Sequence, residues 1–152
     1  MDAFSLRRLD PGHARPAFDC GDSDLNEFFH RDSIVSGEEL LSVTYAIETA
    51  CKAIGFISVL NDSIKKDYLP RSRIKKIFKH IPRDKRYEST PAVKIGRLAI
   101  CKEHAGKGIG TALLDYVKIW FTEKNKTGYL LSLMPITRKK LSIFTRKIVS
   151  IF

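Results

Sequence analysis

Three glycines at alternate positions, placed between a strand-like and a helix-like segment, constrain this chain more than any other feature. Residues 93–101 are rich in branched apolar side chains and predict a buried strand. The string Gly106-Lys107-Gly108-Ile109-Gly110 follows, and apolar residues at helical spacing then continue to about Lys124. Glycines allow backbone N–H groups to close around an anion, and the start of a helix attracts negative charge. The segment 96–114 therefore predicts a site for a phosphate or a pyrophosphate.

Two familiar phosphate-binding patterns do not fit this loop. The Walker pattern G-x-x-x-x-G-K-[ST] does not occur in the chain. A dinucleotide fingerprint requires G-x-G-x-x-G near the start of a βαβ unit, with an acidic residue about 20 positions further on. Here the glycines are more closely spaced, the loop lies deep in the chain, and no such acid is placed.

The segment resembles the central motif of the GNAT family of N-acetyltransferases. The family pattern, Arg/Gln-x-x-Gly-x-Gly/Ala, falls on residues 105–110, and the preceding Gly-Arg-Leu-Ala-Ile strand also looks like that family. The resemblance spans roughly residues 3–132. It implies acetyl-CoA as the acetyl donor and an α/β fold, with a mixed, largely antiparallel sheet flanked by helices. Ala105 departs from the pattern, a departure for which Lys102 or Lys107 would compensate.

The resemblance also implies roles for particular residues. Main-chain groups of Leu98, Ala99 and Ile100 would pair with the pantetheine arm as if it were an added strand, and the N–H groups of the glycine loop would hold the pyrophosphate. The residues expected to bind the cofactor are Leu98, Ala99, Ile100, Ala105, Gly106, Lys107, Gly108, Ile109, Gly110 and Thr111. No catalytic residue is identified. The candidates for a general base are Glu38, Glu39 and Glu48, each more typical of a solvated surface. His104 is interpreted as a surface residue, and Cys101 as a buried packing residue.

The segments around the loop predict the rest of the sheet. The expected elements are a strand near Leu6, a helix that starts at the Asp24–Glu27 capping pattern, a hairpin of residues 43–49 and 53–60, a helix between Pro70 and Pro82, and a strand at residues 129–133. Hairpins followed by a strand, a helix and a strand predict an α/β fold with helices on both faces of one sheet.

Two features of the chain concern the acceptor. The string from Phe18 to Phe29 looks like the opening of a subgroup that includes toxins acetylating aminoacyl-tRNA. Residues 62–90 carry ten Lys and Arg against four acidic residues, within a chain of formal net charge +10. The basic segment 65–86 is a candidate for contact with a tRNA backbone, and such binding would depend on salt. A small amine or a protein N-terminus is also a candidate for the acceptor.

The last residues do not continue the family pattern. The family commonly ends around a string such as D-A-Y-N…F-Y…N-G-F, whereas this chain reads on from Met134 without it. Back-translation with A/T-rich codons and a shift of one base turns residues 134–152 into D-A-Y-N-K-K-K-T-I-N-F-Y-K-K-N-S-F-D-F. We therefore expect an acetyl-CoA-binding domain over residues 1–133 and a frameshifted tail over residues 134–152. The Tyr that usually protonates the thiolate of coenzyme A would be lost with the original frame.

The expected function is transfer of an acetyl group from acetyl-CoA to a primary amine, by direct attack in a ternary complex. Its rivals are the same enzyme acting on aminoacyl-tRNA and an inactive acyl-CoA-binding domain created by the tail. Three well-separated cysteines without a CxxC pair argue for free thiols, a cytoplasmic location and no metal site. No apolar run is long enough to cross a membrane. Apolar residues of the tail favour self-association, which makes a homodimer a candidate assembly.

Overall fold

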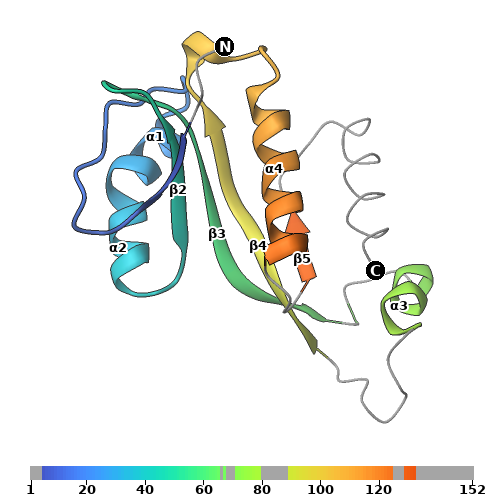
Figure 1. Cartoon of the computed structure of the whole chain (residues 1–152). Helices are drawn as coiled ribbons and strands as arrows, with labels where there is room; N and C mark the ends of the chain where they lie inside the picture. The colour runs from blue at the N-terminus through green and yellow to red at the C-terminus, as the bar shows by residue number, and fades with distance from the viewer. Residues whose placement is uncertain (1–4, 66, 68–70, 80–88, 125–128, 133–152) are drawn as a thin grey trace.

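A five-stranded sheet with helices on both faces forms the body of the molecule (Figure 1). The computed structural model describes residues 5–65, 67, 71–79, 89–124 and 129–132. The elements are β1 (Ser5–Leu9), α1 (Ser23–Glu27), a π-helical turn (Phe28–Asp32), α2 (Ser33–Glu38), β2 (Val43–Glu48), β3 (Ala53–Lys65), α3 (Arg71–Phe78), β4 (Ser89–Ile100), a 3₁₀ turn (Lys102–His104), α4 (Ile109–Lys124) and β5 (Tyr129–Ser132). The tail expected over residues 134–152 lies outside the described residues.

The strands lie in the order β1-β2-β3-β4-β5, so each strand neighbours the next one in the sequence. The first four pair in antiparallel fashion, and β5 pairs with β4 in parallel. This arrangement confirms the predicted mixed and largely antiparallel sheet. The parallel pair requires a crossover connection, and α4 supplies it.

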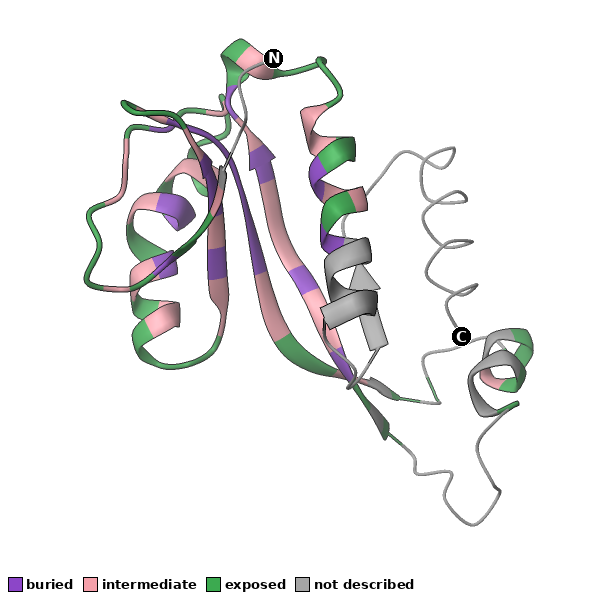
Figure 2. Ribbon diagram, viewed as in Figure 1, coloured by how far each residue is buried: buried purple, intermediate pink, exposed green. Residues whose placement is uncertain are grey.

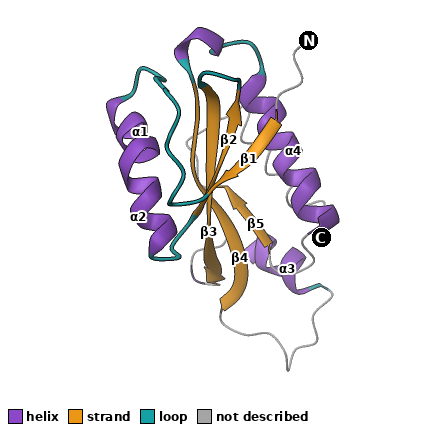
Figure 3. Ribbon diagram, turned by 60° about the vertical axis from the view of Figure 1, so that its left-hand side comes forward, coloured by secondary structure: helices purple, strands orange, loops and turns teal. Residues whose placement is uncertain are grey.

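Helices α1 and α2 cover one face of the sheet, and α4 covers the other (Figure 3). The α1–α2 face has an aromatic core, in which the ring of Phe56 lies 5.0–5.9 Å from those of Phe18, Phe28 and Phe29. The α4 face is aliphatic, and its buried residues are Ile47, Ile54, Ile57, Ile95, Leu113 and Val117. The central strands therefore have buried residues on both faces of the sheet (Figure 2).

The predicted strands and helices occur, with two differences. The cap of the first helix is not at Asp24: the side chain of Asp22 accepts hydrogen bonds from the amides of Asp24 and Leu25, so the helix begins two residues earlier. Strands β3 and β4 are longer than expected, because they continue as a paired ribbon to Lys65 and Ser89 beyond the buried part of the sheet. Polar side chains on this ribbon hid its strand character in the sequence.

In the part of the chain that the structure describes, no helix has both the length and the apolar character needed to cross a bilayer.

Candidate cofactor site

Strand β4 divides at Gly96 into two halves with different neighbours. Arg97 pairs with Ser58 and Ile95 pairs with Val59, so Gly96 is an extra residue in a β-bulge. The parallel pairing with β5 covers Ala92 to Ile95 and ends directly before this bulge. Within the described residues, the half from Arg97 to Ile100 is therefore paired with β3 alone. An open strand edge begins at the bulge.

The backbone groups on this edge are assigned by the pairing with β3. The amide of Cys101 donates to the carbonyl of Ile54 at 2.7 Å, and successive residues of an antiparallel strand direct their backbone groups to opposite sides. Ala99 therefore directs its N–H and C=O toward β3, whereas Leu98 and Ile100 direct theirs to the open edge. Among the described residues, two of the three strand residues expected to pair with pantetheine have main-chain groups without a strand partner, and Ala99 has its own engaged within the sheet.

The glycine loop leads from the end of this edge to the start of α4 (Figure 1). Gly106 and Gly108 have φ values of +76° and +78°, a region that residues with a Cβ adopt only with strain. A Cβ at either position would meet nothing within 4 Å, so the backbone conformation, and not lack of space, requires glycine here. The open space beside both glycines leaves room for a ligand to approach the backbone.

The first turn of α4 presents unpaired amides at the same place. The first hydrogen bond of the helix runs from the amide of Ala112 to the carbonyl of Gly108, at 3.0 Å. The amides of Ile109, Gly110 and Thr111 precede it and have no acceptor within the helix. The helix dipole adds a partial positive charge at this end. These donors fit an anion such as a pyrophosphate.

The third glycine has a different role from the first two. A Cβ at Gly110 would lie 3.5 Å from Cγ1 of Ile100 and 3.8 Å from Cδ2 of Leu98, which is ordinary contact. Its backbone φ is not in the left-handed region. Gly110 therefore marks the place where α4 crosses close to the open half of β4. The loop amides and the strand edge consequently belong to one continuous surface.

The two lysines expected to compensate for Ala105 have different surroundings. Lys102 forms an ion pair with Asp19, and this pairing raises the pKa of the lysine. Lys107 is exposed within the loop and has no ion pair among the residues that the structure describes. Of the two, Lys107 is therefore the one with its charge available to an anionic ligand.

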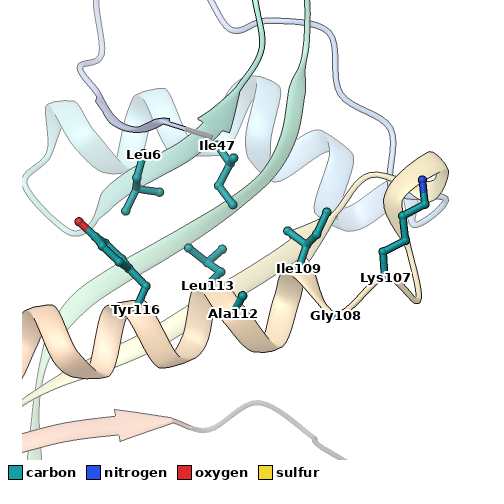
Figure 4. A pocket seen from close by; sticks show the side chains of 8 residues that line it. All are labelled: Leu6, Ile47, Lys107, Gly108, Ile109, Ala112, Leu113 and Tyr116. Carbon is teal, nitrogen blue, oxygen red and sulfur yellow. The ribbon is translucent and has the colours of Figure 1, made fainter. Parts of the chain in front are cut away.

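A hollow of about 380 Å³ lies beside the loop, between α4 and the edge formed by β1 and β2 (Figure 4). Its lining residues are Leu6, Ile47, Lys107, Gly108, Ile109, Ala112, Leu113 and Tyr116. Apart from Lys107 and Tyr116 these are glycine or apolar side chains. The hollow lies on the opposite side of α4 from β5, so it is separate from the open edge of β4.

The candidate bases do not gather at the open edge. Glu48 is held by Arg7 through two hydrogen bonds of 2.8 and 2.9 Å. Glu38 and Glu39 are exposed at the end of α2. The ring of His104 does approach the sulfur of Cys101, with Nδ1 and Sγ 3.1 Å apart, a contact that the sequence did not indicate. The described residues contain no group of three or more His, Cys, Asp or Glu side chains that could hold a metal ion.

Arg97 stands at the point where β4 and β5 separate. Its guanidinium lies over the ring of Phe28, 4.7 Å from the ring centroid, on the α1–α2 side of the sheet. Sequence reasoning did not single out Arg97 or Gly96, because a bulge is defined by its pairing partner and leaves no local pattern. The Gly-Arg pair that begins the family-like strand was the available signal.

An open strand edge that continues into the amides of a glycine loop and a helix suits an extended ligand with an anionic end. A sequence model described as the acetyltransferase (GNAT) family matches residues 13–135, so the chain belongs to the GNAT family of acetyltransferases. The enzyme class that follows is an acetyl-CoA-dependent N-acetyltransferase.

The solved structures similar to this chain include KacT, AtaT and AtaTR. A mutant of KacT is 25% identical, with a TM-score of 0.70, and the match covers 94% of this chain and 84% of that one. AtaT complexed with acetyl-methionyl-tRNAfMet is 20% identical, with a TM-score of 0.72 and coverage of 94% and 84%. AtaTR bound with AcCoA is 21% identical, with a TM-score of 0.69 and coverage of 97% and 86%. The latter two support the fold.

Proposed function

We propose that this chain binds acetyl-CoA with the pyrophosphate on the glycine loop and the pantetheine arm along the open half of β4. The observation that carries the proposal is the end of the described β4–β5 pairing directly before Gly96, which leaves the main-chain groups of Leu98 and Ile100 without a strand partner among the described residues, beside the start of α4. An amide-containing arm placed there would extend the sheet by β-augmentation. The cofactor residues are those expected from the sequence, with Ala99 contributing packing in place of hydrogen bonds.

The length of the open edge suits this arrangement. From Cys101 back to Arg97 the strand rises by about 13 Å, at roughly 3.3 Å per residue. An extended pantetheine arm that starts at the loop would therefore bring its thioester close to the bulge. Arg97 and the α1–α2 face border this point. The acceptor amine would approach the thioester there.

The proposed reaction is direct transfer. A neutral amine attacks the thioester carbonyl, the C–N bond forms and the C–S bond breaks, and the amine proton leaves to a base or to water. The thiolate of coenzyme A takes up a proton in the same sequence. Positioning supplies much of the acceleration, because the thioester is already activated. No described carboxylate lies at a position that identifies it as the base.

The C-terminal residues limit the activity of the chain as it stands. The frameshift hypothesis divides it into an acetyl-CoA-binding domain, residues 1–133, and a replaced tail, residues 134–152. The Tyr expected to protonate the thiolate is missing from the present reading frame. The second candidate function, an inactive acyl-CoA-binding domain, follows from this loss. The tail would also be the source of any homodimer.

A narrower candidate is acetylation of aminoacyl-tRNA. Two observations favour it: the similarity to AtaT, whose structure is a complex with acetyl-methionyl-tRNAfMet, and the basic α3, which has the sequence RSRIKKIF. Arg71 and Lys75 of this helix are exposed. Phosphate contacts of this kind weaken steeply with added salt. A location in the cytoplasm would follow from such a substrate.

Calorimetry and a transfer assay test the proposal together. Acetyl-CoA is titrated into the chain, and acetyl transfer to an amine panel and to aminoacyl-tRNA is then measured with the chain and with a version in which one base restores the D-A-Y-N…F-Y ending. We expect both versions to bind acetyl-CoA and the restored one to be the faster. Binding by both versions with turnover only in the restored one favours the inactive domain, because the tail alone then accounts for the loss of activity. No binding by either at tens of micromolar contradicts the proposed site.

A further inference from the structure

The string from Phe18 to Phe29 has no role in the chemistry proposed so far, yet it lies against the beginning of the glycine loop. The amide of Ala53 donates to the carbonyl of Ala17 at 3.0 Å, and the amide of Lys102 donates to the carbonyl of Asp19 at 3.0 Å. Residues 17–19 therefore attach to the start of β3 and to the turn that follows β4. This turn leads directly into the loop.

The carboxylate of Asp19 joins three parts of this region. Its Oδ1 atom accepts hydrogen bonds from the amide of Gly21 at 2.8 Å and from Nδ2 of Asn26 at 2.9 Å. Its Oδ2 atom forms the ion pair with Lys102. Asn26 in turn accepts a hydrogen bond from the amide of Cys20 at 2.9 Å, which fixes the orientation of its own side chain. The base of α1 and the 3₁₀ turn are thereby tied to one carboxylate.

A second acidic residue of the string has a separate role. Asp22 caps α1 and makes no contact with the turn before the loop among the described hydrogen bonds. Glu27 is paired with Arg31, one turn further along the helical segment. Of the four carboxylates in the string, Asp19 alone contacts the turn before the loop, whereas those of Asp22, Asp24 and Glu27 belong to the helical segment. Asp22 and Glu27 can therefore serve as control positions for substitutions of Asp19.

The loop depends on anchors at its two ends. Gly106 and Gly108 have no side chains, and among the described residues no atom lies within 4 Å of the place where a Cβ would stand. One anchor is α4, and the other is the 3₁₀ turn that contains Lys102. The amides can bind an anion without reorganisation only if both anchors are fixed.

We infer that Asp19 is a positioning residue for the cofactor loop, which it holds in its binding conformation through Lys102 and with the support of Asn26. The inference rests on the proposed function, because it assigns a purpose to the loop that acetyl-CoA would occupy. Asp19 is half-exposed, and a second ion pair, between Lys52 and Glu103, supports the same turn. The expected effect of losing Asp19 is therefore moderate, about a three- to tenfold rise in the Kd for acetyl-CoA.

The test compares two substitutions of the same chemical kind in the same string. Asp19→Asn removes the charge that faces Lys102, and Glu27→Gln removes an exposed, ion-paired carboxylate that does not approach the loop. Asp22→Ala adds a variant in which α1 loses its cap while the loop contacts stay in place. Each variant of the full chain is titrated with acetyl-CoA by calorimetry, and its unfolding midpoint is measured in urea. Lys102→Gln alone and combined with Asp19→Asn completes a double-mutant cycle.

We expect weaker acetyl-CoA binding for Asp19→Asn and Lys102→Gln, no further weakening in the double variant, and unchanged affinity for Glu27→Gln. Asp22→Ala should lower the urea midpoint without altering the Kd. Equal affinity of Asp19→Asn and the unaltered chain would overturn the inference. A loss of affinity in Asp22→Ala as large as that in Asp19→Asn would also overturn it, because the string would then act only through stability. Failure of the unaltered chain to bind acetyl-CoA would instead overturn the proposed function.

Discussion

The two halves of β4 differ in how many neighbouring strands they pair with. Residues 92–95 are paired with β3 on one side and β5 on the other, whereas residues 97–100 are paired with β3 alone among the described strands. The half paired on both sides has its backbone hydrogen bonds satisfied within the sheet. The half paired on one side has main-chain groups left for a ligand. A single residue, Gly96, separates the half paired on both sides from the half that we propose to bind acetyl-CoA.

The proposed site lies where the regular pairing of the sheet is interrupted. The bulge at Gly96 shifts the register of β4 against β3, and the pairing with β5 that the structure describes ends at Ile95, directly before it. The interruption lies next to the loop amides because α4 crosses the open half at Gly110. Substitutions in the closed half should therefore reduce stability, and those that remove outward-facing backbone groups of the open half should reduce acetyl-CoA affinity.

The largest effect is expected in the closed half. Ile95 is fully buried among the aliphatic residues beneath α4. Ile95→Ala should reduce the free energy of unfolding by about 2–5 kcal/mol, because it removes buried methylene and methyl groups and leaves a cavity. Urea unfolding followed by circular dichroism measures the loss. A loss below about 1 kcal/mol would show that this half is not the structural one.

The next effect concerns the conformation of the loop. Gly108→Ala places a Cβ on a residue with φ of +78°, which costs about 1–2 kcal/mol and moves the neighbouring amides. We expect acetyl-CoA affinity to fall about tenfold or more. Gly110→Ala is the matched control, since this residue has no positive φ and a Cβ there makes only ordinary contacts. Equal losses in the two variants would contradict the separate roles of the glycines.

A smaller effect should distinguish the two sides of the open half. Leu98→Pro removes an N–H that points to the open edge, and one hydrogen bond to the pantetheine arm is worth about 0.5–1.5 kcal/mol. Its Kd for acetyl-CoA should rise up to about tenfold, with a modest loss of stability. Ala99→Pro removes an N–H that bonds to β3 and should mainly destabilise the fold. A loss of stability in Leu98→Pro together with a loss of affinity in Ala99→Pro would show that the backbone groups point in the opposite directions to those assigned.

The sequence predicted this site in part, for physical reasons that differ between its residues. Gly106, Gly108 and the start of α4 are local features, because a positive φ and an unpaired helix amide depend on a few adjacent residues. The roles of Gly96 and Ala99 depend on which strand stands beside them, and this is a property of the folded sheet. The link from Asp19 to Lys102 joins residues far apart in the chain. The capping pattern at Asp24 was wrong because Asp22, two residues earlier, has the same chemistry.

The smallest effect concerns the pH dependence of stability. The hydrogen bond from Lys102, followed by those from the amide of Gly21 and from Asn26, holds the pKa of Asp19 well below its usual range. A lowered pKa in the folded state means that the ionised carboxylate stabilises the fold above the ordinary aspartate pKa of about 3.9, and that this contribution is lost as the pH falls further.

The difference in unfolding free energy between the unaltered chain and Asp19→Asn should therefore stay constant from about pH 8 to pH 5 and shrink below about pH 4. Urea unfolding over a pH series measures it, with Glu27→Gln as the control for an exposed carboxylate outside the loop contact. Added salt should reduce the difference, because the pair with Lys102 is open to solvent. A difference that changes between pH 5 and pH 8 would show that another titrating group, and not Asp19, governs the support of the open half.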